Sequence, residues 1–246
     1  MNKKSLKKIG ITGAAGNIGA TLSAGLRDNY DLTLYDINTI RHAPDAKCVK
    51  VDFAEKEKLN GVFDGLDALI HLAGNPHPNA PASNTYRNNF QALSQTFEEA
   101  RRAGVKKIVF ASSNFYHESA LGYALRNGEW NSITLDQPPT PLSLYGISKV
   151  YGENLGRHLS YLGMQFVALR IGWTTPEDNP ALYGGSYMRA VFCSKSDLVS
   201  AFTRALEVET DFMAAFAVSN NTHGVFDLAE TRKKLGFSPL DNADNY

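Results

Sequence analysis

Short apolar segments alternate with longer amphipathic segments along the whole chain. The apolar segments lack polar alternation, as in Ala68–Leu72 and Ile108–Ala111, which indicates strands covered on both faces. The amphipathic segments between them predict helices, so the order of elements favours βαβ units and a parallel sheet. We expect strands at residues 8–12, 31–35, 48–51, 67–72, 107–111, 166–170 and 213–218, and helices at 17–27, 55–60, 84–103, 145–162, 196–207 and 228–235.

Two connections between these elements are unusually long, at residues 112–144 and 171–195. Both follow predicted strand ends, and open α/β sheets bind ligands at the carboxyl ends of their strands. Loops of this length in a compact domain usually serve function. We therefore expect a single domain over residues 1–246, in which 171–195 is a long loop on the substrate side.

The amino-acid composition argues against several kinds of binding partner. Lys plus Arg and Asp plus Glu number 25 each, so the net charge is zero and there is no basic field for nucleic acid. The longest stretch without a charged residue, 68–86, contains three prolines, which argues against a membrane span. Cys48 and Cys193 are too few for a disulfide framework or a zinc site, so we expect two small buried thiols, no metal and a cytoplasmic location.

A glycine-rich segment, Thr12–Gly19, lies between the first predicted strand and the first predicted helix. In that context Gly13 permits a tight turn, Gly16 lets the backbone approach a pyrophosphate, and Gly19 allows close packing of helix and strand. The helix N-terminus then offers N–H donors to the phosphates. The segment predicts a dinucleotide site in a Rossmann-type, doubly wound α/β sheet, with a plain strand–helix turn as the alternative.

Two carboxylates follow the next two strands. Asp36 ends the second strand, where it can accept hydrogen bonds from ribose hydroxyls and would repel a 2′-phosphate, so NAD is favoured over NADP. Arg41 lies close enough in the sequence to keep NADP open. Asp52 follows the third strand and precedes Ala54 and Glu55, where it can cap a helix, contact the cofactor, or do both.

Tyr145 and Lys149 are four residues apart in a predicted helix, so they share one face of it. The Lys ammonium would favour the phenolate and lower a Tyr pKa that is ordinarily about 10. That would give a general base near neutral pH. The alternative is an exposed helical pair without a catalytic role. Ser112 and Ser113 follow an upstream apolar strand and are candidate polar partners of the base.

Taken in this order, the glycine segment, Ser112-Ser113 and the segment 145–149 resemble the short-chain dehydrogenase/reductase superfamily. Five segments are closely similar to the uronate dehydrogenases, small extended-type members of that superfamily: 108–114, 144–149, 169–172, 218–221 and 235–239. The resemblance covers nearly the whole chain. It implies a small C-terminal substrate-binding portion and NAD-dependent oxidation of a cyclic aldohexuronate at C1 to an aldarolactone.

The resemblance also implies roles for individual residues. Tyr145 is the base, Lys149 lowers its pKa and holds the nicotinamide ribose, and Ser113, preferred to Ser112, hydrogen-bonds the reacting oxygen. The implied cofactor-binding residues are Gly13, Ala15, Gly16, Asn17, Ile18, Asp36, Asp52, Phe53, Leu72, Ala73, Gly74, Asn89, Tyr145 and Lys149. The implied substrate-binding residues are Asn75, Ser113, Asn114, Phe115, Trp173, Tyr187 and Arg189.

Departures from the family pattern concentrate in the expected substrate pocket. Phe115 and Trp173 stand where the family carries His and Ser. The Arg that binds the uronate carboxylate in the family aligns with Tyr187, and Arg189 is the only Arg or Lys in residues 172–194. Because a bidentate Arg–carboxylate contact depends on position, Arg189 is the candidate anchor and the uronate assignment depends on it.

The histidines give weaker signals. His71 lies in an apolar segment and is expected to be a core residue. His77 and His117 lie on expected loops near the pocket, where a contact to a sugar hydroxyl and a plain surface position are both open. No histidine pattern resembles a metal site.

Two other function classes share these features. A sugar-nucleotide epimerase or dehydratase has the same cofactor and Tyr/Lys pattern, but it usually carries a longer C-terminal region. A non-catalytic NAD-binding regulator would not need the Ser, Tyr and Lys set. The superfamily commonly pairs the helices equivalent to 84–103 and 145–162 between subunits, so we expect a homo-oligomer.

Overall fold

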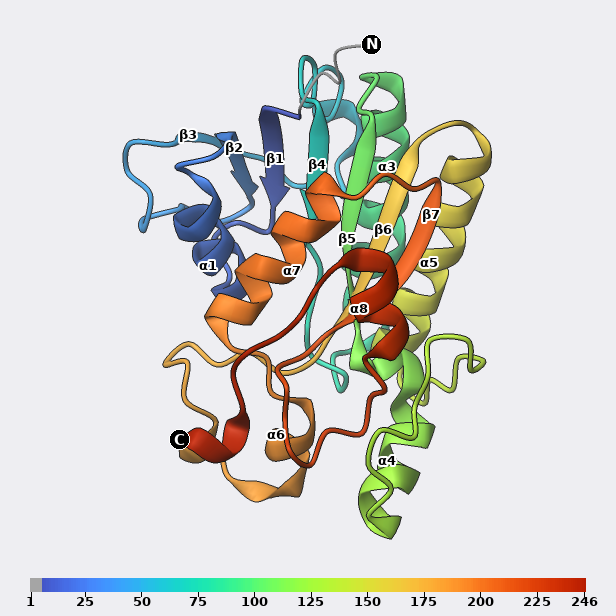
Figure 1. Cartoon of the computed structure of the whole chain (residues 1–246). Helices are drawn as coiled ribbons and strands as arrows, with labels where there is room; N and C mark the ends of the chain where they lie inside the picture. The colour runs from blue at the N-terminus through green and yellow to red at the C-terminus, as the bar shows by residue number, and fades with distance from the viewer. Residues whose placement is uncertain (1–5) are drawn as a thin grey trace.

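The computed structural model describes residues 6–246, in which seven strands form one parallel sheet (Figure 1). The strands are β1 (Lys8–Thr12), β2 (Asp31–Asp36), β3 (Lys47–Lys50), β4 (Ala68–His71), β5 (Lys107–Ser113), β6 (Gln165–Ile171) and β7 (Phe212–Ala217). Their order is β3-β2-β1-β4-β5-β6-β7, so the direction of winding reverses between β1 and β4. The predicted doubly wound sheet is confirmed, with no strand end shifted by more than two residues.

Helices cover both faces of this sheet (Figure 1). They are α1 (Asn17–Leu26), α2 (Ala82–Thr85), the π-helix η2 (Tyr86–Gln91), α3 (Ala92–Arg102), α4 (Glu118–Asn127), α5 (Leu144–Tyr161), α6 (Gly185–Val191), α7 (Lys195–Glu207) and α8 (Ala229–Leu235). On β4, Ile70 packs in one apolar cluster with α1 and α7, and its neighbour Leu69 packs in another with α3. The strands therefore lack polar alternation because helices cover both faces of the sheet.

The predicted helix 84–103 is continuous but not uniform, because α2, η2 and α3 follow one another without a break. Within the π-helical segment Asn89 is buried, and its side-chain amide pairs with both backbone polar groups of Asn75. π-Helical segments are rare and often occur at functional sites. The predicted helix 55–60 is wrong, since only a 3-10 turn, Lys56–Lys58, forms there.

The two long connections contain helices that the sequence pattern did not predict. The first holds α4, which ends at Gly128 in the left-handed conformation with φ 66°. The second holds α6, which begins after Gly184. Both lie beyond the carboxyl ends of the strands, as does the C-terminus (Figure 1).

The predicted loop 171–195 is closed at its base by two backbone hydrogen bonds. Trp173 N–H donates to the Val191 carbonyl at 2.8 Å, and Cys193 N–H donates to the Trp173 carbonyl at 2.9 Å. A side chain at Gly172 would collide with the Val191 carbonyl. Position 172, where the start of the loop passes the Val191 carbonyl, therefore requires glycine.

The prediction of two buried thiols is correct for one cysteine and wrong for the other. Cys193 is buried, but Cys48 is exposed because it lies on β3, which forms the edge of the sheet. Within residues 6–246, no helix is long and apolar enough to cross a membrane. In the same range, no group of three or more His, Cys, Asp or Glu side chains could hold a metal ion.

Candidate active site

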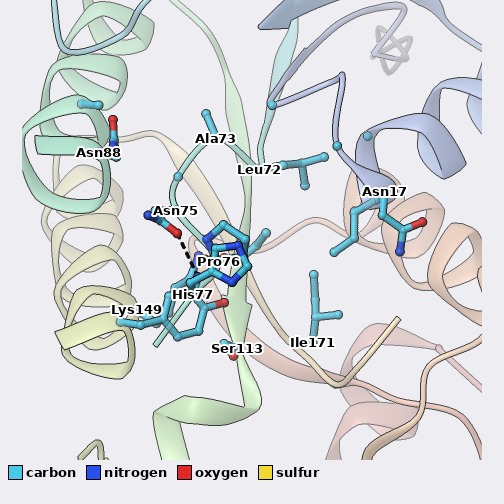
Figure 2. A pocket seen from close by; sticks show the side chains of 18 of the residues that line it. Asn17, Leu72, Ala73, Asn75, Pro76, His77, Asn88, Ser113, Lys149 and Ile171 are labelled. Atoms are coloured by element: carbon cyan, nitrogen blue, oxygen red, sulfur yellow. Dashed lines mark hydrogen bonds between the residues drawn. The ribbon is translucent and has the colours of Figure 1, made fainter. Parts of the chain in front are cut away.

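A cavity of about 1000 Å³ follows the carboxyl edge of the sheet from β3 to β6. Figure 2 shows part of its wall, where Pro76 and His77 are drawn in front of the end that contains Lys149 and Ser113. The cavity crosses the point between β1 and β4 at which the winding of the sheet reverses. This is where open α/β sheets form their ligand crevice.

The glycine segment forms the floor of the cavity next to α1. Gly13 has φ 71°, and a Cβ there would lie 2.8 Å from the Ala73 backbone nitrogen. A Cβ at Gly19 would lie 2.5 Å from the Ala14 carbonyl oxygen, so both positions need glycine. Gly16 precedes the first turn of α1 and would place its Cβ no closer than 3.4 Å to its neighbours. These residues leave the N-terminus of α1 open to the cavity and fit the pyrophosphate of a dinucleotide.

Asp36 is held rigidly at the end of β2. Only 7% of the residue is exposed, and its two carboxylate oxygens accept backbone N–H groups from Ala15 at 2.9 Å and Asn38 at 2.8 Å. The carboxylate lines the cavity with lone pairs free for ribose hydroxyls. Arg41 is exposed and is not part of the cavity wall. The structure therefore fits NAD at this position.

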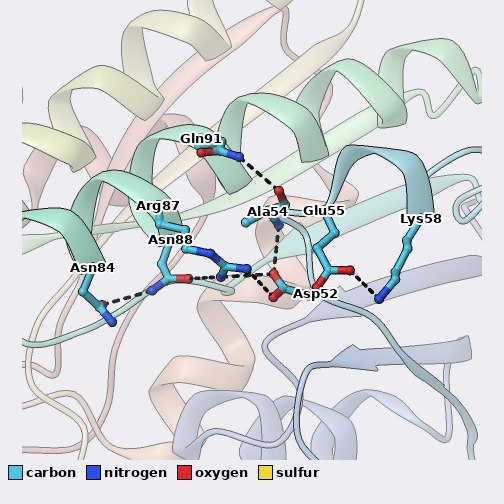
Figure 3. A network of polar contacts seen from close by, with 8 residues as sticks. All are labelled: Asp52, Ala54, Glu55, Lys58, Asn84, Arg87, Asn88 and Gln91. Carbon is cyan, nitrogen blue, oxygen red and sulfur yellow. Dashed lines mark hydrogen bonds and ion pairs between the residues drawn. The ribbon is translucent and has the colours of Figure 1, made fainter.

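Asp52 lines the cavity, and its contact with a cofactor stays a prediction (Figure 3). It accepts the Ala54 N–H at 3.0 Å just before the 3-10 turn Lys56–Lys58, whose N-cap is Glu55, and it pairs with Arg87 of η2 at 2.7 Å. Burial alone would raise the pKa of this carboxyl, but the hydrogen bonds from Arg87 and Ala54 and the Arg87 charge bring the pKa below its usual value. Arg87 lines the cavity and was missed in the sequence, because its partner is 35 residues away.

Ser113, Tyr145 and Lys149 meet at the other end of the cavity. Lys149 Nζ lies 5.2 Å from the centre of the Tyr145 ring and donates to the Ala111 carbonyl at 2.8 Å. The Ser113 hydroxyl accepts the Phe115 N–H at 3.2 Å and donates to Asn114 Oδ1 at 3.0 Å. The predicted convergence of the three side chains is therefore present.

The predicted effect of Lys149 on Tyr145 is wrong in this structure. Burial raises the pKa of Tyr145, and a hydrogen bond with Ser113 acts in the opposite direction. Burial also lowers the pKa of Lys149 to about 8. The ammonium lies beside the Tyr145 ring and directs its hydrogen bond to a carbonyl, so it does little to stabilise a phenolate there.

Ser112 and Ser113 differ in the hydrogen bonds that their hydroxyl groups make. The Ser112 hydroxyl is buried and donates to Glu153 Oε1 at 2.6 Å. Glu153 also forms an ion pair with Arg170 at 2.9 Å, and both side chains are only 2% exposed. Ser112 also lines the cavity, but its hydroxyl is committed to this buried network, whereas the Ser113 hydroxyl bonds only to neighbouring residues of the wall, so Ser113 stays the preferred serine.

Amide and aromatic side chains form the wall around Ser113. Asn114 Nδ2 donates to Tyr187 Oη at 2.8 Å, and the Tyr187 ring meets Trp173 at 5.5 Å. Phe115 packs edge-on against Tyr145 at 5.6 Å. Asn75, another predicted substrate residue, lines the same cavity.

Two predicted contact residues do not line the cavity. The side chain of Arg189 is 62% exposed and faces Asp244 at 3.6 Å. It lies two residues after Tyr187 on α6, and two residues correspond to about 200° around a helix axis, so the two side chains point to opposite sides. Asn89 is behind the wall, where it supports Asn75.

The three histidines near the site lie in different environments. His71 is a core residue as predicted, and burial first, then the Lys149 charge, lowers its pKa to about 3. His117 is fully buried against Arg170, so neither a surface position nor a sugar contact describes it. His77 is exposed and lines the cavity.

The remaining predicted residues all line the cavity. On the cofactor side these are Gly13, Ala15, Gly16, Asn17, Ile18, Asp36, Asp52, Phe53, Leu72, Ala73, Gly74, Tyr145 and Lys149. The lining residues that the sequence did not single out include Ile37, Asn38, Asn84, Arg87, Asn88 and Thr174. Most of them carry no motif, although Asn38 follows directly from the position of Asp36.

Comparisons with known proteins agree with this geometry. A model of the NAD dependent epimerase/dehydratase family matches residues 9–174. The chain is 30% identical to an L-arabinose 1-dehydrogenase (NAD(P)(+)) of Haloferax volcanii, over 97% of this chain and 98% of the relative. It is also 30% identical to an NAD-dependent glucose-6-phosphate dehydrogenase of the same organism, over 96% and 94% of the two chains. A mutant uronate dehydrogenase from Agrobacterium tumefaciens, solved in complex with NAD, superposes with a TM-score of 0.83 at 29% identity, covering 98% of this chain and 87% of the other.

Proposed function

Because this chain belongs to the NAD dependent epimerase/dehydratase family, we propose that it oxidises the C1 hydroxyl of a cyclic sugar or sugar acid to a lactone, with NAD as the oxidant. The observation that carries the proposal is the meeting of Ser113, Tyr145 and Lys149 at one end of a cavity whose other end carries the glycine segment and Asp36. Two relatives that match over nearly their full length are an L-arabinose 1-dehydrogenase and a glucose-6-phosphate dehydrogenase.

The residues at the chemical end divide the reaction between them. Bound NAD supplies the hydride acceptor for the hydrogen on C1. Tyr145, as phenolate, takes the proton of the anomeric hydroxyl, so that the C1–O bond becomes the lactone carbonyl. Ser113 turns its hydroxyl hydrogen from Asn114 to the same oxygen and orients it. Lys149 lies next to Tyr145 and would bind the nicotinamide ribose.

A panel of free sugars, sugar acids and sugar phosphates tests this function. We expect at least one of them to reduce NAD, with one NADH and one lactone formed per sugar consumed. A sugar-nucleotide epimerase would instead interconvert its substrate without net NADH, so product stoichiometry separates the two functions. If the protein bound NAD and no sugar in the panel produced NADH, the dehydrogenase proposal would be wrong.

We also propose that the protein is a homo-oligomer that pairs through η2 and α5. Tyr86 is 55% exposed, Ile147 42% and Tyr151 37%, and the three lie on these elements. Phe90 lies 5.5 Å from Tyr86 and 5.3 Å from Tyr151, so the two exposed tyrosine rings belong to one patch. Light scattering that gave the mass of one chain at micromolar concentration would overturn this.

A cytoplasmic location is proposed on chemical grounds. Cys48 and Cys193 are both free thiols, and Cys48 is exposed, which suits a reducing compartment. Fractionation of the source cells would test it, because the enzyme should appear in the fraction that contains the NAD pool.

A further inference from the structure

We propose that the sugar oxidised at this site is a neutral aldose, recognised by amide and aromatic side chains, and not a uronate or a sugar phosphate. This inference rests on the dehydrogenase function proposed above and names its substrate class. It comes from the distribution of charge along the wall of the cavity.

The fixed charges of the cavity wall cancel. Among the lining residues, Asp36 and Asp52 carry two negative charges, and Arg87 and Lys149 carry two positive charges. Arg87 is neutralised by Asp52 at 2.7 Å. Lys149 lies beside Tyr145 and donates to the Ala111 carbonyl at 2.8 Å, and burial lowers its pKa to about 8. Because Lys149 is also the residue proposed to bind the nicotinamide ribose, neither cation is left to pair with an acid or phosphate group of the sugar.

Arg87 is also in the wrong place. It is bound to Asp52 after β3, whereas Ser113 ends β5. The strands β2, β1 and β4 lie between these two in the sheet, so Arg87 is engaged at the side of the cavity next to β3 and not at Ser113.

Arg189 does not supply the missing cation. Its side chain points out of α6 toward Asp244, while Tyr187 on the opposite side of the helix lines the cavity. Burial raises the pKa of Tyr187 to about 12, so this hydroxyl stays neutral. His77 also lines the cavity and is exposed to solvent.

The groups that do surround Ser113 suit a neutral sugar. Asn75 and Asn114 offer amide donors and acceptors for hydroxyl groups, and Tyr187 offers a phenol. Trp173 is 44% exposed and packs edge-on against Tyr187, which leaves ring surface for the C–H face of a sugar. An anion in the same place would lose its hydration without gaining a counter-charge, which is costly.

Matched sugars test the inference directly. We would measure kcat/KM for D-galactose against D-galacturonate and for D-glucose against D-glucose 6-phosphate, with saturating NAD at about pH 8, where imidazole side chains carry little charge. We expect the neutral member of each pair to be at least tenfold better. An anionic member that matched or exceeded its neutral partner would overturn the inference.

Binding to the protein–NADH complex, followed by calorimetry, separates recognition from turnover. Tighter binding of galactose than of galacturonate supports the inference even if the best substrate is a different aldose. Tighter binding of galacturonate overturns it. The absence of NADH production from any sugar, with NAD binding intact, would instead overturn the dehydrogenase function itself.

A pair of variants tests the missing charge. Tyr187→Arg adds a cation to the wall, and we expect it to raise the ratio of kcat/KM for galacturonate over galactose at least tenfold. Arg189→Ala is the matched control two residues away, and it should change both values less than twofold. An unchanged ratio in a Tyr187→Arg protein that still binds NAD, or a selective loss of the acid in Arg189→Ala, would overturn the charge argument.

Discussion

Among single residues, Tyr145 gives the most direct test of the mechanism, because its phenol oxygen is the proposed base. Tyr145→Phe keeps the ring and its contact with Phe115 but removes the oxygen that takes the proton. We expect kcat to fall at least about 100-fold, the lower range for general acid–base catalysis, while NAD affinity changes less than twofold. Stopped-flow rates and NAD titration measure the two effects. A variant with near-normal kcat would remove the phenolate from the mechanism.

The pH dependence of the wild-type enzyme follows from the same residue. Burial raises the pKa of Tyr145, so the phenolate fraction and the rate of sugar oxidation should increase as the pH rises and fall as it drops. A plot of kcat/KM against pH should therefore rise throughout the alkaline range. A flat profile up to the unfolding limit would indicate a different base.

Asp36 sets the expectation for cofactor choice. Its carboxylate is fixed by two backbone N–H groups, so it cannot turn away from a 2′-phosphate. We expect the wild type to prefer NAD over NADP at least tenfold in kcat/KM, and Asp36→Ala to reduce that preference. Parallel titration of both cofactors measures it. Tighter binding of NADP than of NAD by the wild type would show that Asp36 does not exclude a 2′-phosphate.

Sequence reasoning succeeded for residues fixed by backbone geometry. Gly13 and Gly19 are predicted correctly because a strand, a turn and a helix in close contact allow little else. Arg189 was misplaced because the sequence does not say which side of α6 faces the cavity. Arg87 was missed because its partner Asp52 comes from a different element.

At the scale of elements, the strands were predictable and the short helices were not. A strand such as β4, buried on both faces, leaves a clear apolar signal. By contrast, α4 contains Gly122 and polar residues, and α6 has only seven residues. Their stability comes from tertiary packing on Phe216 and Phe226, which a local pattern does not reveal.

The buried network around Glu153 joins three elements. Glu153 on α5 accepts from Ser112 on β5 and from Arg170 on β6. Because Glu153→Ala leaves Arg170 as a buried unpaired charge, we expect it to lower the free energy of unfolding by about 3–5 kcal/mol. The exposed neighbour on the same helix gives the control, since Asn154→Ala should change stability by about 0.5 kcal/mol or less. Urea unfolding compares them, and equal effects would contradict the prediction.

At the scale of the whole molecule, two buried histidines couple stability to pH. Burial, together with the Lys149 charge for His71 and the Arg170 charge for His117, lowers both pKa values from 6.5 to about 3. The unfolded chain therefore binds two more protons than the folded one between these values, and stability falls as the pH drops below about 6.5. Two protons correspond to a slope of at most about 2.7 kcal/mol per pH unit.

Urea unfolding at several pH values between about 7 and 5 checks this slope. His71→Gln removes one of the two protons, so we expect it to reduce the pH dependence by about half. His42 is exposed, and His42→Gln should leave the slope unchanged. A wild-type protein whose stability did not change over this range would show that the two histidines are not held neutral.

The closed base of the 171–195 loop has a consequence for how this protein can change over time. Gly172 and the two backbone hydrogen bonds between Trp173 and the end of α6 fix the ends of the intervening segment beside the sheet. Doubling the length of a closed loop costs only about 0.6 kcal/mol, so insertions within it cost little once its ends are fixed. New sugar specificities can therefore arise, or be introduced in the laboratory, through insertions and exchanges at the exposed residues 181–186, while the buried residues of α6 and the dinucleotide half of the molecule stay the same.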